Sequence, residues 1–415
     1  MSLWLLPQIT MLLLVVPLII LSFYLIMLSV AACLHPDKPL ISGVFHGNRH
    51  PESRFLILIP AHNEELLLGE VIRKLRMQSY PDTHYKIVVI ADNCDDKTAY
   101  IARKAGATTL VRHEPDRRGK GQALNWAIRG HLADSAIPWD GLVIIDADSV
   151  LNPDFLWFMN ERLQQGFQVM QAYYGVSNPA ESWRTSLMCA ALSVFHFLRP
   201  LGRDKIGLPC GLKGNGMCFA RPLVERFGYP AISVVEDVEL ALIYLRHDIG
   251  VKFTPGAQVY GQMAATTNQA NSQRKRWEGG RLSLVADWAL PLWNEGWNEK
   301  NLSKLDGAMD LFVPPLTLLV IPTAFGWLFM LLVMFLHSSV LGAIIFALWS
   351  AAFLAIILYL ATGLLLIKAP PAVWIQLSAA PLFIFWKISV YLRMAYTGKK
   401  TPSEWVRTER HEMKK

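Results

Sequence analysis

The chain has 415 residues, of which 53% are hydrophobic and 18% are charged, and its formal net charge is +7. This length allows one large domain or two modest ones. The positive charge is modest and contains no long basic run, so it suits an anionic membrane surface better than a nucleic-acid groove, and we expect no nucleic-acid partner. Five cysteines at scattered positions form neither a disulfide framework nor a metal motif, which indicates a reducing compartment.

Apolar residues are concentrated towards the two ends of the chain. Residues 3–33 are almost free of charge, and residues 311–396 contain several long apolar runs. A bilayer core needs about 20 apolar residues per helix, so we predict an N-terminal transmembrane anchor at 1–35 and transmembrane or re-entrant helices at 311–396. A cleaved lipoprotein signal is the alternative for the first run, because "SVAAC" at 29–33 looks like a cleavage box. The run is longer than a signal's apolar core and no basic residue precedes it, which favours a retained anchor.

Charges beside the first apolar run predict its orientation. Lys38 and Arg49 follow the run, and nothing basic precedes it. We therefore expect residues 36–278 to form a cytoplasmic domain of a multi-pass protein in the inner (plasma) membrane. Residues 279–310, which include "RLSLVADWALPLW", are predicted to be amphipathic helices at the membrane interface, in contact with membrane lipids.

The C-terminal end of the chain gives conflicting signals. Segments 313–336 and 339–366 are long enough to span a membrane, and a third segment at about 372–395 carries Lys387 and Arg393. Three spans after a cytoplasmic domain would place the basic tail at 397–415 outside, whereas its charge favours the cytoplasm. We therefore expect the third segment to be re-entrant or interfacial.

Between the apolar ends, short strand-like patterns alternate with amphipathic helical ones. Four runs rich in β-branched residues are "FLILI" at 55–59, "KIVVI" at 86–90, "TTLV" at 108–111 and "GLVIID" at 141–146. Their alternation with helical segments predicts an α/β domain with a parallel sheet and helices on both faces. Ligands of such sheets bind at the carboxyl ends of the strands.

Acidic and polar residues follow these strands. The first strand leads into Pro60 and Glu64, the second ends in Asp92, and the fourth is followed by Asp146 and Asp148. Each alone could cap a helix, but acids at several strand ends on one rim would repel one another without a cation. Asp146 and Asp148 stand at i and i+2, so both carboxylates can face one divalent ion that also binds phosphate oxygens. The D-x-D therefore predicts Mg²⁺ or Mn²⁺ and a diphosphate substrate.

Three further segments carry candidate residues. "RRGKGQALNWA" places Lys120 between two glycines at a helix start, which suits phosphate, although a turn with solvated cations is the alternative. Glu236 and Asp237 begin another helical run, where acids are ordinarily partners of the helix dipole. "CGLKGNGMCF" includes Gly214 and Asn215, and its glycines indicate either backbone close to a sugar or a tight turn between strands.

The order of these motifs resembles that of membrane-embedded family 2 glycosyltransferases, the group of cellulose, chitin, hyaluronan and poly-N-acetylglucosamine synthases. The motifs are Asp92, Asp146-x-Asp148, Glu236-Asp237 and Gln273-x-x-Arg276-Trp277. The resemblance runs from about Phe55 to Trp277. It implies a GT-A-type, Rossmann-like domain with a mixed, mostly parallel sheet, flanked by transmembrane helices.

The resemblance also implies roles for individual residues. Asp237 is similar to the general base that deprotonates the acceptor, with Glu236 beside it, and Val235 stands where threonine is usual. Asp148 and Asp146 resemble the acids that hold Mg²⁺ or Mn²⁺ near the diphosphate. The residues predicted to bind the nucleotide sugar are Pro60, Glu64, Asp92, Lys120, Asp146, Gln273 and Arg276. Those predicted to bind the acceptor are Gly214, Asn215 and Trp277.

The segment "QRKRW" at 273–277 fits a diphosphate and a sugar together. On a helix, Gln273, Arg276 and Trp277 are spaced i, i+3 and i+4 and share one face. Arg276 can neutralise the leaving diphosphate, Trp277 can stack on an acceptor sugar, and Gln273 can hydrogen-bond to either.

Together these features predict a metal-dependent inverting hexosyl- or N-acetylhexosaminyl-transferase. Its donor is a nucleotide-diphosphate sugar, a UDP-sugar, and its acceptor a growing polysaccharide at the cytoplasmic membrane face, with a β-linked product. The alternative is a single addition to a lipid or polyprenyl-phosphate acceptor, because some lipid transferases share the Q-x-x-R-W form. A transporter is disfavoured because the apolar segments carry few ionisable residues, and an inactive binding subunit because every proposed catalytic acid is present.

Overall fold

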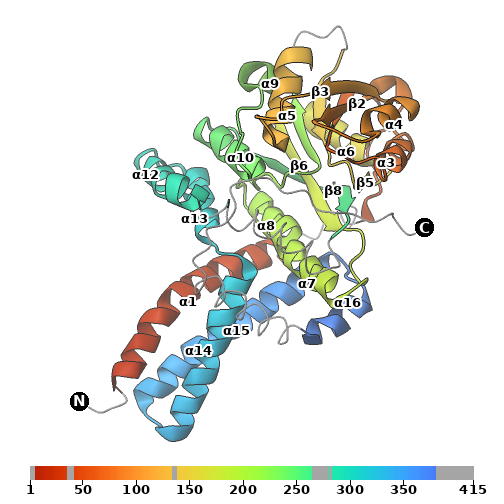
Figure 1. Cartoon of the computed structure of the whole chain (residues 1–415). Coiled ribbons are helices and arrows are strands. Elements are labelled where there is room, and N and C mark those ends of the chain that lie inside the picture. The colour runs from red at the N-terminus through yellow and green to blue at the C-terminus, as the bar shows by residue number, and fades with distance from the viewer. Residues whose placement is uncertain (1–4, 35–41, 133–137, 264–279, 281–282, 380–415) are drawn as a thin grey trace.

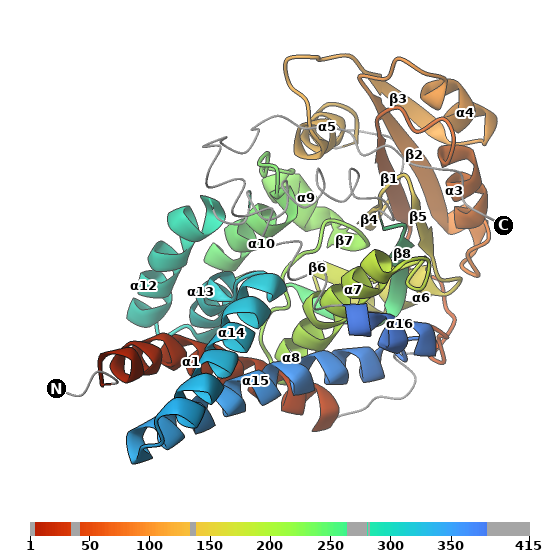
Figure 2. The ribbon, with the colours of Figure 1, turned by 60° about the horizontal axis from the view of Figure 1, so that its bottom comes forward.

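The computed structural model describes residues 5–34, 42–132, 138–263, 280 and 283–379 (Figure 1). An α/β domain and a group of long apolar helices make up most of this part of the chain. The long helices extend away from one side of the domain, as the two views in Figures 1 and 2 show.

The α/β domain is built on one mixed sheet of eight strands in the order β3-β2-β1-β4-β7-β6-β8-β5. Four of the seven strand pairings are parallel, and β7 runs antiparallel to both of its neighbours. The predicted α/β architecture with a mixed, mostly parallel sheet is confirmed. The strands are β1 (Phe55–Ala61), β2 (Tyr85–Asp92), β3 (Thr108–Arg112), β4 (Gly141–Ile144), β5 (Ser149–Leu151), β6 (Val169–Val176), β7 (Met217–Ala220) and β8 (Lys252–Gly261).

Helices cover both faces of the sheet, which explains why the central strands are continuously apolar. On β1, Leu56 and Leu58 belong to one core and Ile57 and Ile59 to the core on the opposite face, as expected for the period of two in a strand. The first core includes α5 (Lys120–Ala127) and α10 (Glu236–Arg246); the second includes α3 (Leu68–Leu75), α4 (Thr98–Lys104) and α6 (Phe155–Gln164). Short α9 (Arg221–Phe227) follows β7.

A long helical element connects the sheet to the apolar helices. It consists of α7 (Trp183–Leu192), the π-helical segment η3 (Ser193–Leu198) and α8 (Arg199–Lys205). A Cβ on Gly202 would lie 2.3 Å from the carbonyl oxygen of Leu28, so only glycine allows the backbones of α8 and α1 to approach this closely.

Three helices in the described residues are long and apolar enough to cross a membrane: α1 (Leu5–Leu34), α14 (Leu316–Leu336) and α15 (Val340–Leu366), with mean hydropathies of 2.9, 2.3 and 2.6. They match the segments predicted at the N-terminus and at 313–336 and 339–366. They pack against one another through a buried cluster of six residues: Met11, Val15, Met330, Val333, Ile345 and Trp349.

After α15 the chain returns to the α/β domain. Short α16 (Pro371–Gln376) lies against α7, where the hydroxyl of Ser186 donates a hydrogen bond to the Gln376 side chain at 2.8 Å. The segment predicted at 372–395 therefore begins, in its described part, as a short helix on the domain. Residues 380–395 lie outside the described part of the chain.

A helical hairpin stands between the domain and α14. The π-helical segment η4 (Val285–Ala289) leads into α12 (Leu290–Asn298), and α13 (Leu302–Phe312) follows. Leu292 and Ala308 of the hairpin are buried against Leu242 and Leu245 of α10. The hairpin is thus attached to the helix that begins with Glu236 and Asp237.

Candidate active site

The carboxyl ends of β1, β2 and β4 share one rim of the sheet. Pro60 of β1 pairs with Ile90 of β2 in register, and Leu58 pairs with Ile144 of β4. Asp92 ends β2, and Asp146 comes two residues after β4. The strand-end residues expected to lie together are therefore brought to one edge, where parallel sheets bind their ligands.

Lys120 connects two of the predicted segments. Its Nζ lies 2.5 Å from Asp146 Oδ1 and 2.5 Å from the carbonyl oxygen of Gly214. Gly119 precedes it with φ of +120°, a conformation that glycine adopts without strain. Burial acts to lower the pKa of Lys120, but the carboxylates of Asp146, Glu236 and Asp237 outweigh it and raise the pKa above its ordinary value. Lys120 is therefore a fixed positive charge at this rim.

Glu236 and Asp237 start α10 beside the same lysine. A Cβ built on Gly214 would lie 3.2 Å from Asp237 Oδ2, so the backbone of this glycine approaches the carboxylate closely. Burial raises the pKa of Asp237 and raises that of Glu236 to about 7, while Lys120 opposes both shifts. A carboxylate pair that can take up a proton near neutral pH has the property required of a general base.

The D-x-D segment fits a hard divalent cation. Asp146 keeps a third of its side chain exposed, whereas the carboxylate of Asp148 is buried and accepts a hydrogen bond from the hydroxyl of Ser149 at 3.3 Å. Among the described residues no group of three or more His, Cys, Asp or Glu side chains could hold a metal. Two carboxylates in one short segment are the kind of donor set that Mg²⁺ or Mn²⁺ takes together with diphosphate oxygens.

Asp92 is held by a residue that the sequence analysis did not select. Arg112, the last residue of β3, donates to Asp92 Oδ1 at 2.6 Å, and its guanidinium side chain is only 1% exposed. The same guanidinium donates to the carbonyl oxygen of Arg117 at 2.6 Å, in the loop that leads to Lys120. Burial raises the pKa of Asp92, and Arg112 opposes the shift. In the sequence, the sign of this role was the position of Arg112 directly after the apolar run "TTLV".

The turn after β1 lies against the turn after β2. His62 Nδ1 is 2.7 Å from the carbonyl oxygen of Asp92, and the backbone N–H of Glu64 donates to the hydroxyl of Thr98 at 2.7 Å. Asn63 and Asn93 both adopt left-handed backbone conformations, with φ of 54° and 49°, which asparagine tolerates better than most residues. The two turns thus lie side by side, and the predicted role of Glu64 in binding the nucleotide stays a prediction.

Asn215, which was predicted together with Gly214 to bind the acceptor, contacts the D-x-D segment through its side chain. It is fully buried, and its amide contacts the backbone of Asp146 and the hydroxyl of Ser149. Its side chain supports this segment, and the predicted binding of the acceptor at Asn215 stays a prediction. Gly214 lies next to Asp237, and its predicted contact with the acceptor also stays a prediction.

Gln273, Arg276 and Trp277 lie outside the described residues, so their predicted roles stay predictions. The nearest described residue that follows them is Gly280. A Cβ on Gly280 would lie 2.8 Å from a methyl group of Val235, so the backbone there packs on the residue just before Glu236.

The sequence matches a known family over most of the domain. The profile of the family described as "Glycosyltransferase like family 2" matches residues 51–280. A β-monoglucosyldiacylglycerol synthase of Trichormus variabilis is 27% identical over 278 residues, which cover 65% of this chain and 56% of the relative. The Bacillus subtilis protein named "Probable glycosyltransferase YdaM" is 25% identical over 236 residues, 55% of each chain. The chain thus spans a little over half the length of these relatives.

Among solved structures, a mannosyltransferase of Pyrobaculum calidifontis in complex with GDP-Man and Mn²⁺ is similar in outline. The match covers 82% of this chain and 98% of that one, at 16% sequence identity and a TM-score of 0.47.

Proposed function

The chain belongs to glycosyltransferase family 2, and from this premise we propose that it transfers a sugar from a UDP-sugar to a hydroxyl group of a membrane lipid. One observation carries the chemistry. Lys120 contacts both Asp146 and the Gly214 carbonyl, and Gly214 lies against Asp237, so a charge clamp for a diphosphate and a candidate base stand within one cluster. A transfer reaction needs these two groups side by side.

The proposed reaction is a single displacement. Asp237 takes the proton of the acceptor hydroxyl, whose oxygen attacks the anomeric carbon of the donor. The bond from that carbon to the β-phosphate oxygen breaks, and its electron pair leaves with the nucleoside diphosphate. Lys120, and Arg276 from the motif, stabilise the charge of the leaving group. One displacement inverts the anomeric carbon, so an α-linked donor gives a β-linked product.

A bound Mg²⁺ or Mn²⁺ would neutralise part of the diphosphate charge in the donor complex. Asp146 and Asp148 would hold it. We assign binding of the donor's nucleoside to Asp92, whose carboxylate can accept a hydrogen bond from uracil N3–H or from ribose hydroxyls. Arg112 keeps this carboxylate in place.

Two considerations favour a lipid acceptor over a growing polysaccharide. The first is the name of several relatives, β-monoglucosyldiacylglycerol synthase, an enzyme that acts on a lipid. The second is packing: the interior between α1, α14 and α15 is filled by side chains such as Trp349 and Met330, which are almost completely buried. In the described part of the chain the centre of these three helices is therefore filled, whereas a lipid acceptor needs no passage across the membrane.

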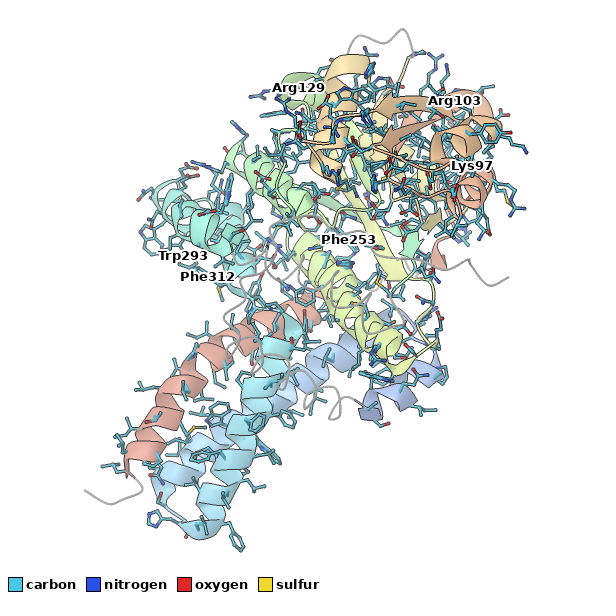
Figure 3. The ribbon with its side chains drawn as sticks, viewed as in Figure 1. Lys97, Arg103, Arg129, Phe253, Trp293 and Phe312 are labelled. Carbon is cyan, nitrogen blue, oxygen red and sulfur yellow. The ribbon has the colours of Figure 1, made fainter. Side chains whose placement is uncertain are left out.

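We further propose that the domain lies at the cytoplasmic face of the inner membrane, with the hairpin of α12 and α13 at the lipid interface. Leu290, Trp293 and Trp297 share one face of α12 and are 63%, 36% and 69% exposed. Figure 3 shows Trp293 and Phe312 on the lower side of this hairpin, toward the spanning helices. Tryptophan is favoured at the headgroup level of a bilayer.

A spin label tests this placement. With Cys33 changed to serine and Trp297→Cys labelled in liposomes, we expect collisions with lipid-soluble oxygen to exceed those with a water-soluble nickel complex. A label at Asp82→Cys, an exposed position before β2, should show the reverse order. Equal behaviour at both positions would contradict an interfacial α12.

The acceptor class is tested with purified protein, Mn²⁺, liposomes containing diacylglycerol and a panel of radiolabelled nucleotide sugars. We expect label from one UDP-sugar in a small product that extracts into organic solvent, and none with Asp237→Asn. A long, water-soluble product would instead establish polysaccharide synthesis. No transfer from any donor would contradict the proposed function.

A further inference from the structure

A buried chain of hydrogen bonds joins the loop at 213–216 to the D-x-D segment, and Asn215 is at its centre. Asn215 Oδ1 accepts from the backbone N–H of Asp146 at 3.2 Å, and its Nδ2 donates to Ser149 Oγ at 2.8 Å. Ser149 Oγ donates in turn to Asp148 Oδ1 at 3.3 Å. A single side chain therefore holds both ends of the segment that carries the two metal-binding acids.

Asn215 is itself fixed from the sheet. Gln171 of β6 donates from Nε2 to the carbonyl oxygen of Asn215 at 2.8 Å and accepts from the backbone N–H of Lys213 at 2.8 Å. Gln171, Asn215 and Ser149 are all 0% exposed. Buried side chains of this kind do not reach a donor or acceptor, and their hydrogen bonds are directional, so they act by setting the position of their neighbours.

The same loop reaches the candidate base from its other side. The carbonyl of Gly214 accepts from Lys120 Nζ, and its backbone lies against Asp237. The four-residue loop thus touches the metal-binding acids through Asn215 and the base through Gly214. Because neighbouring residues of one short loop make these two contacts, the distance between the two groups depends on the loop.

We propose that Asn215 is a positioning residue that sets the placement of Asp146 and Asp148 and thereby the affinity of the site for a divalent cation with a nucleoside diphosphate. This rests on the proposed function, which requires those two acids to bind the metal. Partners that hydrogen-bond to metal ligands fix their orientation, and their loss typically lowers metal affinity or activity by about 10- to 100-fold.

The test measures how tightly the protein binds Mn²⁺ in the presence of UDP. Binding is monitored by the loss of the electron paramagnetic resonance signal of free Mn²⁺. We expect Asn215→Ala to weaken Mn²⁺ binding by about 10- to 100-fold while the protein stays folded. Asn160→Ala is the matched control. Asn160 is also a buried asparagine, which accepts from the backbone of Ser53 at 3.0 Å and donates to the carbonyl of His50 at 3.2 Å, away from these loops. Its loss should leave Mn²⁺ affinity unchanged.

Ser149 provides a second variant that keeps the test decisive if Asn215→Ala does not fold. Ser149→Ala removes the hydroxyl that links Asn215 to Asp148, and we expect it to lower Mn²⁺ affinity less than Asn215→Ala does. Ser149→Thr keeps the hydroxyl and should bind Mn²⁺ as tightly as the wild type. If wild type binds Mn²⁺ and both alanine variants bind it equally well, the positioning role is wrong. If wild type itself does not bind Mn²⁺ with UDP, the proposed metal site is wrong.

Discussion

Changing Asp237 to asparagine is expected to lower kcat by about 1,000-fold, because general-base catalysis contributes about 10²–10⁴-fold and asparagine cannot accept the proton. The side chain keeps its size at the start of α10, so the helix and the neighbouring Gly214 need not move. The donor contacts proposed at Asp92, Lys120 and Asp146 are untouched. Affinity for UDP and metal should therefore change little. Initial rates and calorimetric binding of UDP with Mn²⁺ separate the two effects.

Asp82→Asn is the control for this substitution. Asp82 is an exposed aspartate in the short helix before β2, at the end of that strand opposite to Asp92. It should retain full activity. An Asp237→Asn enzyme that keeps more than about a tenth of the wild-type kcat would fall outside the range for general-base removal and would assign the proton to another group.

Half of the sheet could be predicted because its strands are uniform. β1, β2 and β4 are continuous apolar runs, covered by helices on both faces. The other half is less regular. β5 has only three residues, and β8, "KFTPGAQVYG", contains a proline and glycines and pairs with β6 across an irregularity at Ala172 and Tyr173. Short or interrupted strands carry too little periodicity to be recognised.

The position of the candidate acids on one rim was predictable, whereas the residues that support them were not. Asp92, Asp146 and Asp148 follow apolar strands, and parallel pairing alone brings them to one rim. Asn215 meets Asp146 only because β7 pairs antiparallel with β4, which places the N–H of Gly216 3.0 Å from the carbonyl oxygen of Ile144. The two paired strands are far apart in the sequence, so no local sequence pattern predicts their contact. The glycines around Asn215 indicated either a sugar contact or a tight turn, and neither interpretation identified the buried hydrogen bonds of its side chain.

The contacts that attach the domain to the long apolar helices could not be predicted from a local sequence pattern either. Tyr24 of α1 donates to Asp306 Oδ1 of α13 at 2.8 Å, and Arg203 of α8 donates to Asp306 Oδ2 at 2.6 Å. The side chains of Arg203 and Asp306 are 4% and 7% exposed. Helices α1, α8 and α13, which are far apart in the sequence, thus meet at the buried carboxylate of Asp306.

Removing that carboxylate is expected to destabilise the protein strongly. In Asp306→Ala, Arg203 keeps only the longer contact to Asp310 at 3.5 Å, and the Tyr24 hydroxyl loses its acceptor. Breaking a buried ion pair by deleting one partner typically costs about 3–5 kcal/mol, because the remaining charge stays buried. We expect a loss of about 3 kcal/mol in the free energy of unfolding, measured by denaturant titration of the detergent-solubilised protein.

A substitution of an exposed acid shows whether burial is the reason for the loss of stability. Asp248 is 65% exposed and lies 3.6 Å from Lys304, and asparagine tolerates its left-handed backbone (φ of 59°), so Asp248→Asn should cost less than about 1 kcal/mol. The double variant Arg203→Met, Asp306→Leu removes both charges together and should recover most of the stability that Asp306→Ala loses, since no buried charge is left without its partner. If Asp306→Ala were no less stable than Asp248→Asn, the link through Tyr24, Asp306 and Arg203 would not hold the domain on the long apolar helices.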